Sequence, residues 1–376
     1  MNFEIENGRV LVGDCFREGS LHVAEGRVVD TNVGGVRIDA RGCLVLPGIV
    51  DVHGDAFERQ VQPRPKVRFP LEIALRETDN QLISNGITTA YHGLTVSWEP
   101  GLRSIETARE FVKSFRRLRS ELATDTKLHI RWETFALEEL DEILTWLEDE
   151  PAPIFAINDH TTSVMTGGVQ ARKLGSMVAR SGLSEADFGD RMEAVWARRD
   201  EVPHAISNAA GKARSAGAVL FAHDEASVAD RTLFRSLGAV VSEFPMNEDT
   251  AEAARDAGEH TILGAPNVIR GGSHNGAMSA APAVVSGLCT VLTSDYYYPS
   301  PLVAPFKLHR EHGVPLADAW NLVSKNAVEA AQLSDRGTLQ PGKRADFLLV
   351  DDTNPEAPQV VCSFVAGRKV FDRRNM

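Results

Sequence analysis

Hydrophobic and polar residues alternate at both ends of the chain with the two-residue period of β-strands. The pattern covers residues 3–12, 20–30, 36–48, 345–351 and 360–371. Glu25-Gly26 and Ala366-Gly367 are typical hairpin turns within it. Either end alone is too short to bury a hydrophobic core. The pattern therefore predicts one small β-domain, formed by residues 1–47 together with residues 337–376.

Between the two ends, apolar runs of strand character alternate with helical stretches, as in repeated βα units around a parallel sheet. Eight such runs lie at residues 43–55, 86–93, 127–135, 153–160, 218–225, 239–245, 261–267 and 289–297. Helical patterns include residues 71–86, 106–122 and 314–333. Residues 161–215, the longest stretch without a strand, predict helical insertions over one barrel mouth. This α/β order favours a closed (β/α)₈ barrel of the TIM type at residues 48–336.

Charge and composition exclude several classes of protein. The chain has 376 residues, 43% of them hydrophobic, and a formal net charge of −12. This charge repels nucleic-acid backbones, and no basic stripe offsets it. The four cysteines form no C-x-x-C pair, which argues against a zinc ribbon or a redox couple. With no signal peptide and no run of about 18 apolar residues, we expect a cytoplasmic protein that binds neither nucleic acid nor a membrane.

Residues of metal-binding type recur where the barrel strands are expected to end, which is where such barrels carry catalytic groups. His53 and Asp55 lie two positions apart, so the pleat sends both side chains to one face. The corresponding ends of four further runs carry Glu133, His160, His223 and Asp295. Each has an alternative: a hydrogen-bonded core histidine, a helix N-cap aspartate, or an ion pair of Glu133 with Arg131. Their recurrence predicts a divalent metal site, with zinc first and manganese or iron as alternatives.

Basic residues beside this predicted site indicate the charge of the substrate. Arg64, Lys66 and Arg68 alternate in a proline-rich segment, and an extended chain points them to one side. They favour an anionic substrate, with a solvated charge run as the alternative. Arg270 and His274 lie in a glycine-rich segment, where a backbone can approach a ligand closely. Substrate binding and an ordinary loop are both open for these two residues.

Motifs along nearly the whole chain resemble a known family. LPGIVDVHGD and GKRADFLLVD are similar to segments of the amidohydrolase superfamily, whose members combine a metal-bearing barrel with a β-sandwich made from both termini. More narrowly, DVHGDAFERQVQPRPKVRFP, LGAPNVIRGGSHNGAMSA and LTSDYYYPS resemble the α-D-ribose 1-methylphosphonate 5-triphosphate diphosphatase family of phosphonate metabolism. The resemblance implies this two-domain fold and a hydrolase that removes pyrophosphate from a sugar triphosphate.

The resemblance also implies roles for individual residues. It implies that six side chains are the ligands of two metal ions, with Glu133 bridging the ions: His53, Asp55, Glu133, His160, His223 and Asp295. Asp295 serves as the base when activated water attacks phosphorus. The basic residues noted above neutralise the charge that develops on the phosphate.

Two departures from the family lie beside the predicted metal site. The family shows Thr-Asp-Asn where this chain has Gly54-Asp55-Ala56, and Ser-Pro-Gly-Gln where residues 161–164 are Thr-Thr-Ser-Val. They leave open the hydrolysis of a C–N bond in a small anionic amide or cyclic amide. A third hypothesis, from another class, is a metal-binding barrel without catalysis. The expected partners are a small anionic substrate, a phosphorylated sugar under the first hypothesis, and a second copy of the chain.

Overall fold

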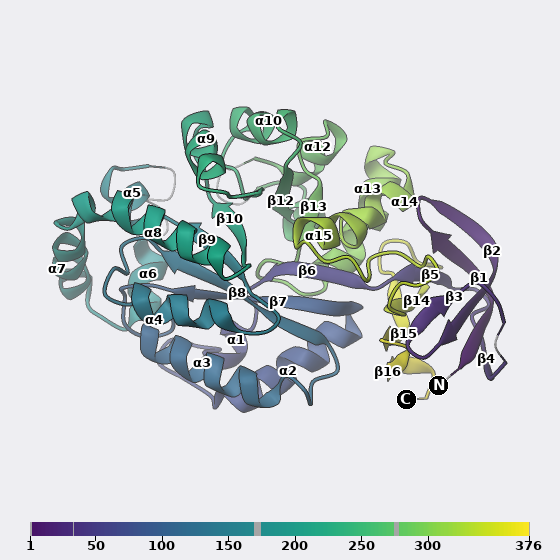
Figure 1. Ribbon diagram of the computed structural model, residues 1–376. Coiled ribbons are helices and arrows are strands. Elements are labelled where there is room, and N and C mark those ends of the chain that lie inside the picture. The colour runs from purple at the N-terminus through teal and green to yellow at the C-terminus, as the bar shows by residue number, and fades with distance from the viewer. Residues whose placement is uncertain (1, 33, 169–173, 274–277, 376) are drawn as a thin grey trace.

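Two β-sheets organise the chain (Figure 1). The computed structural model describes residues 2–32, 34–168, 174–273 and 278–375. One sheet lies where the two termini meet, and the other forms the centre of the molecule with helices around it (Figure 1). No helix in these described ranges is long and apolar enough to cross a membrane.

The terminal sheet contains strands from both ends of the chain. Its strands are β1 (Phe3–Val12), β2 (Cys15–Ala24), β3 (Arg27–Val29), β4 (Val36–Asp39), β5 (Leu44–Pro47), β14 (Phe347–Asp351), β15 (Gln359–Val365) and β16 (Arg368–Asp372). The two ends join where β14 pairs antiparallel with β5. Both predicted hairpin turns form, and their central residues have the positive φ angles of such turns, for example Glu25 at 50° and Gly26 at 77°. The predicted β-domain from both termini is confirmed.

The central sheet is a parallel barrel. Its strands, in spatial order, are β6 (Ile49–Gly54), β7 (Ile87–Val96), β8 (Asp125–Glu133), β9 (Ile154–Asn158), β10 (Val219–His223), β11 (Val241–Glu243), β12 (His260–Gly264) and β13 (Val291–Thr293). The first and last strands meet just beyond their ends, where the Asp55 amide donates to Asp295 O and the Asp295 amide donates to His53 O, both at 2.9 Å. The predicted (β/α)₈ barrel is confirmed, and its closure brings residues 240 positions apart into contact.

The sequence run at residues 43–55 forms two strands instead of one. β5 belongs to the terminal sheet and β6 to the barrel, and Gly48 lies between them. A Cβ atom on Gly48 would lie 2.1 Å from Thr88 Oγ1, so only glycine allows the chain to pass this close to β7. We propose this change of sheet as the first domain boundary, with the return to the terminal domain near residue 337.

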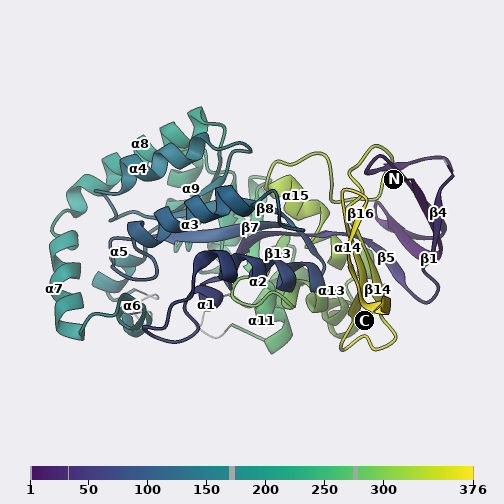
Figure 2. The ribbon, with the colours of Figure 1, turned by 90° about the horizontal axis from the view of Figure 1, so that it is seen from below.

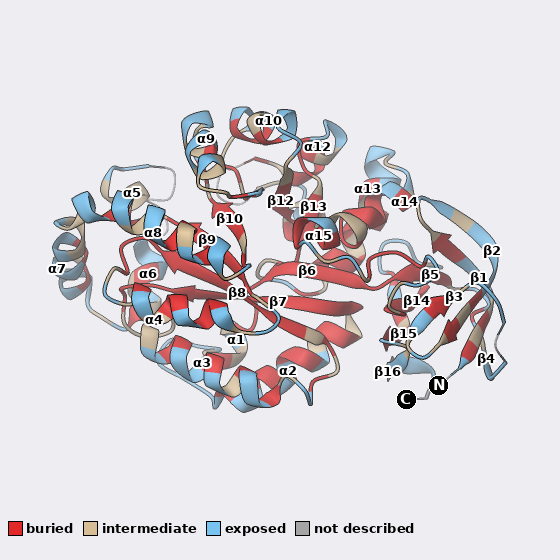
Figure 3. Cartoon of the chain, viewed as in Figure 1, coloured by how far each residue is buried: buried red, intermediate tan, exposed pale blue. Residues whose placement is uncertain are grey.

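Helices surround the barrel strands (Figure 2). They are α1 (Glu58–Val61), α2 (Leu71–Ser84), α3 (Ile105–Leu118), α4 (Leu140–Thr145), α5 (His160–Met165), α6 (Leu174–Ser181), α7 (Glu185–Trp196), α8 (Val202–Ser215), α9 (Val228–Ser236), α10 (Glu248–Asp256), α11 (Ala265–Arg270), α12 (Ala280–Val285), α13 (Ser300–His312), α14 (Leu316–Asn321) and α15 (Lys325–Ala330). Figure 3 shows buried strands and helices whose outer faces are exposed. The helical pattern predicted at residues 314–333 is two helices, because the backbone at Ser324 leaves the helical region (φ −133°, ψ −89°).

The expected helical insertion lies between β9 and β10. Helices α5 to α8 occupy it, and its described residues contain no strand. Trp98, Phe135 and Phe188 form part of a separate hydrophobic cluster that packs this insertion against the ends of β7 and β8. The insertion is therefore anchored to the carboxyl ends of the barrel strands, where the predicted site lies.

Candidate functional site

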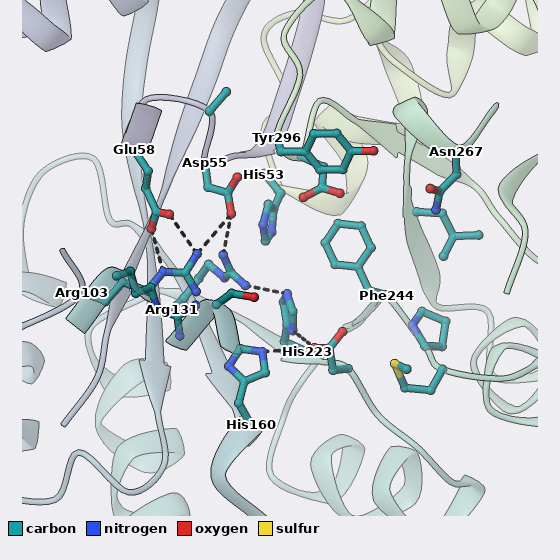
Figure 4. A pocket seen from close by; sticks show the side chains of 18 of the residues that line it. His53, Asp55, Glu58, Arg103, Arg131, His160, His223, Phe244, Asn267 and Tyr296 are labelled. Atoms are coloured by element: carbon teal, nitrogen blue, oxygen red, sulfur yellow. Dashed lines mark hydrogen bonds and ion pairs between the residues drawn. The ribbon is translucent and has the colours of Figure 1, made fainter. Parts of the chain in front are cut away.

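A cavity of about 440 Å³ opens at the carboxyl ends of the barrel strands. Five of the six predicted metal ligands line it: His53, Asp55, His160, His223 and Asp295. Figure 4 shows imidazole rings from β6, β10 and the start of α5 turned toward one another across it. The convergence expected from strand-end positions therefore occurs, whereas metal ligation itself remains a prediction.

The first donor group consists of His53, Asp55 and Asp295. One ligand atom of each lies within 4.8 Å of the others. His53 is 1% exposed, and its Nδ1 lies 2.8 Å from Glu243 Oε1. A carboxylate on one ring nitrogen orients a metal-binding histidine and leaves Nε2 as the nitrogen for the ion. Glu243 was not predicted as a site residue.

The second donor group consists of His160, His223 and Asp224. Asp224 Oδ2 lies 3.2 Å from His160 Nε2 and 3.3 Å from His223 Nδ1. Ligands about 2.1 Å from a tetrahedral ion lie roughly 3.4 Å apart, so this spacing suits zinc. Asp224 adjoins His223 at the strand end, and its position after β10 was the signal that could have added it to the predicted set.

Glu133 lies behind the second group and belongs to neither group. Its carboxylate accepts hydrogen bonds from the amides of His160 and Thr161 and from Thr161 Oγ1, at 3.2, 3.1 and 2.8 Å. Burial opposes its ionisation, but hydrogen bonds from His160 and Thr161 hold the pKa of Glu133 below its usual value. It also contacts His160 Nδ1 at 3.2 Å and thereby orients the ring. A metal-bridging role for Glu133 remains a prediction.

A buried arginine separates the two donor groups. Arg131 Nη1 donates to Asp55 Oδ2 at 3.2 Å, and Arg131 Nη2 lies 3.0 Å from His223 Nε2 (Figure 4). Since a guanidinium only donates, His223 Nε2 accepts, and a neutral ring carries its proton on Nδ1. Ligation of an ion by either nitrogen of His223 therefore requires Arg131 to move away, since Nε2 is occupied and Nδ1 carries the proton while the contact lasts. The anticipated ion pair of Arg131 with Glu133 is replaced by the contact with Asp55.

The ring charges suit metal binding. Burial lowers the pKa of His223 to about 3 and that of His53 well below its usual value, and Arg131 acts in the same direction on both. Both rings are neutral at physiological pH, which is the form that binds metals. Neutral imidazoles beside carboxylates are the ligands that zinc and related divalent ions take, so these residues fit such an ion.

Backbone strain concentrates at the same place. Asp224, Phe244 and Asp295 have φ angles of 58°, 54° and 52°, and all three line the cavity. A residue other than glycine in this left-handed region costs about 1–3 kcal/mol and persists where the surrounding structure requires it. The strand-end turns thus hold their side chains in fixed positions, as a catalytic site requires.

The described residues among those predicted to bind substrate do not line this cavity. Arg64, Lys66 and Arg68 are exposed, and none of them lines the cavity. Arg270 is exposed and donates to Tyr296 Oη at 3.5 Å, and Tyr296 lines the cavity. His274 lies outside the described residues. Substrate binding by these five residues remains a prediction, whereas the arginines that line the cavity are Arg59, Arg103, Arg131 and Arg180.

Replacing Glu243 with glutamine is expected to weaken metal binding about 10–100-fold, because His53 loses the charged partner that orients its ring. Competition with a chelator of known affinity measures the change. Glu225→Gln is the matched control, since Glu225 is also a buried carboxylate but contacts Arg231 and Ser242 instead of a histidine. Equal metal affinity in the two variants would contradict the role of Glu243.

Known proteins share this architecture. No protein-family model matches the chain. The α-D-ribose 1-methylphosphonate 5-triphosphate diphosphatase of Escherichia coli (strain K12) is 29% identical over 356 residues, which cover 92% of this chain and 94% of that protein. The crystal structure of an amidohydrolase from a Sargasso Sea environmental sample has a TM-score of 0.67 at 14% identity, covering 99% of this chain and 93% of that one. The crystal structure of N-acetylglucosamine-6-phosphate deacetylase from Pasteurella multocida has a TM-score of 0.63 at 12% identity, covering 98% of this chain and 99% of that one.

These similarities agree with the sequence motifs at both ends of the chain. The resemblance to the diphosphatase extends over both the barrel and the terminal sheet, since it covers 92% of the chain. The solved structures share the fold across nearly their full length. The chain is therefore similar to this diphosphatase over nearly its whole length and shares the fold of the solved amidohydrolase and deacetylase structures.

Proposed function

We propose that the chain is a metal-dependent diphosphatase that hydrolyses α-D-ribose 1-methylphosphonate 5-triphosphate and releases pyrophosphate. One observation carries the proposal: the cavity combines imidazole and carboxylate donors with four arginines. A polyanionic substrate needs such cations, because the chain as a whole is negatively charged. The name of the Escherichia coli relative supports the choice of substrate.

The chemistry assigns separate tasks to the residues of the cavity. The donor groups would hold a divalent ion, which would act as a Lewis acid toward a phosphoryl oxygen and a water molecule. Asp295 takes the proton of the water that attacks phosphorus. The bond from that phosphorus to its bridging oxygen breaks, and pyrophosphate leaves. Arg103 and Arg131, both largely buried, neutralise charge on the phosphate oxygens.

The test is pyrophosphate release by the full-length protein from α-D-ribose 1-methylphosphonate 5-triphosphate. We expect turnover in the usual range for enzymes, about 1–10³ per second, with protein that elemental analysis shows to contain zinc, manganese or iron. Removal of the metal with a chelator should abolish release, and adding it back should restore release. Turnover no faster than that of an Asp295→Asn variant would contradict the proposal.

The residues around the donor groups favour hydrolysis of a C–N bond as the second candidate. Ala56, which lines the cavity, stands where the diphosphatase family shows asparagine, so one polar contact to a substrate is missing. N-acyl and cyclic amides with a carboxylate or phosphate group should be assayed beside the triphosphate. Turnover of an amide alone would favour the second candidate, and no metal-dependent turnover of any compound would favour a binding protein.

A further inference from the structure

The cavity has two chemically different parts. The metal-donor groups occupy one part, and three arginines with one serine occupy another: Arg59, Arg103, Ser176 and Arg180. These four residues come from three separate segments, namely α1, the loop before α3, and α6 of the insertion. Ser176 and Arg180 are four residues apart on α6 and therefore lie on the same face of that helix. We refer to these four residues as the arginine wall.

Two guanidinium groups of the arginine wall are held in place by carboxylates. Arg103 Nε and Nη2 donate to Glu58 at 2.8 and 3.0 Å, and Arg180 Nε donates to Glu99 Oε1 at 2.7 Å (Figure 4 shows the first pair). Both arginine side chains are mostly buried, with 12% and 17% exposed. Their Nη1 groups make no hydrogen bond with any described residue, so each keeps donors for a ligand.

The guanidinium of the third arginine makes no hydrogen bond or ion pair within the described ranges. Arg59 follows Glu58 on α1 and is exposed, its backbone amide bonds to Ala56 O, and its charge acts on Asp55 from a distance. Arg103 also lies 3.7 Å from Asp55, so three carboxylates face the three guanidinium groups of the wall: Asp55, Glu58 and Glu99. Arg131, which contacts Asp55 at 3.2 Å, adds a fourth cation. Arg103 also opposes the protonated charge of Arg180, since burial first and Arg103 second lower the pKa of Arg180. An anion between these guanidinium groups would relieve that repulsion.

We propose that the arginine wall is a subsite for a phosphate or phosphonate group of the substrate that is not itself attacked. This inference rests on the proposed function, whose substrate carries phosphorus groups at both ends of the sugar. Arginine binds tetrahedral oxyanions through paired N–H donors, and positions fixed in advance lower the entropic cost of binding. The apolar side chains of Phe244, Met246 and Leu263 line the same cavity and suit the uncharged part of a sugar.

Titration calorimetry of the full-length protein tests the subsite with inorganic phosphate, methylphosphonate and pyrophosphate. Arg59→Ala should weaken binding of at least one of them about tenfold or more, because it removes a charge without breaking an internal contact. Arg17→Ala is the matched control, since Arg17 is exposed on β2 of the terminal sheet and does not line the cavity. A preference for methylphosphonate would identify the phosphonate end of the substrate as the ligand, and a preference for pyrophosphate would identify the triphosphate end.

Two further results separate the subsite from the metal-donor groups. Phosphate binding should persist within about threefold in a His53→Ala variant, and Arg59→Ala should raise KM while kcat changes less than about threefold. Wild-type affinity in Arg59→Ala, or loss of binding in a folded His53→Ala variant, would overturn the subsite. Pyrophosphate release is measured separately, so its absence with intact Arg59-dependent phosphate binding would refute the proposed function alone.

Discussion

Replacing His53 with alanine is expected to lower kcat/KM for pyrophosphate release by at least about 10³-fold, since loss of a partner that only orients a ligand already costs about 10–100-fold. Among the described residues, three groups could hold an ion, and His53 belongs to two of them, one with Asp55 and Asp295 and one with His223 and Glu243. Its loss therefore removes the imidazole that these groups share. Metal content should fall together with activity.

Elemental analysis of the purified variant and steady-state kinetics measure the two effects. His260→Ala is the matched control, because His260 begins β12 at the opposite end of the barrel and does not line the cavity. The control should keep its metal and its activity. If the His53→Ala variant kept both, the first donor group would not be the catalytic metal site.

The barrel and most of the donor residues could be predicted because the strands and the metal-binding residue types at their ends are both visible in the sequence. Apolar runs with His, Asp or Glu at or near their ends are visible in the sequence, and a closed barrel brings all such ends to one rim. His53, His160, His223 and Asp295 were found in this way, and they line one cavity. Neither their distances nor their ring orientations follow from such a pattern.

The arginine wall could not be predicted for a different physical reason. Arg103 lies in the loop before α3, and Arg180 lies on α6 of the insertion. The positions of this loop and this helix relative to the barrel depend on tertiary contacts. Gly101 shows such a contact, because a Cβ atom there would lie 2.5 Å from the Arg180 carbonyl oxygen. In contrast, the conspicuous basic residues of the proline-rich segment remain exposed. Spacing of charges along an extended segment does not determine which charges reach a cavity.

Arg131 lies on the same strand as a predicted metal ligand, but the sequence pattern did not identify it as a residue of the cavity. His129, Arg131 and Glu133 alternate along β8, so their side chains share one face of the strand. All three are buried, and Arg131 contacts a residue from each donor group. A cation among metal ligands competes with the ion for the same lone pairs. We therefore expect the number of ions that the site binds to depend on the position of the Arg131 side chain.

Replacing Asp295 with asparagine is expected to lower kcat about 10²–10⁴-fold, the usual contribution of a general base. Asparagine has nearly the same shape and keeps a carbonyl oxygen, but it cannot take a proton. Asp295 lies at φ 52° in the barrel closure, and its side chain packs closely against Gly264, where a Cβ atom would lie only 3.2 Å from Asp295 Oδ2. A substitute at this position therefore needs the same shape. Backbone bonds to His53 and Asp55 should persist in the variant.

Excess metal distinguishes the two roles that Asp295 has in the proposed mechanism. If Asp295 served only as a ligand, saturating metal would restore kcat in the Asp295→Asn variant, because the ion could still be held by His53 and Asp55. If Asp295 is the base, kcat stays low at any metal concentration while elemental analysis finds the ion bound. Asp256→Asn on the exposed side of α10 is the control and should retain wild-type kcat. Recovery of activity with metal would leave the proton transfer to another residue of the cavity, of which Asp55 and Asp224 are the nearest candidates by donor group.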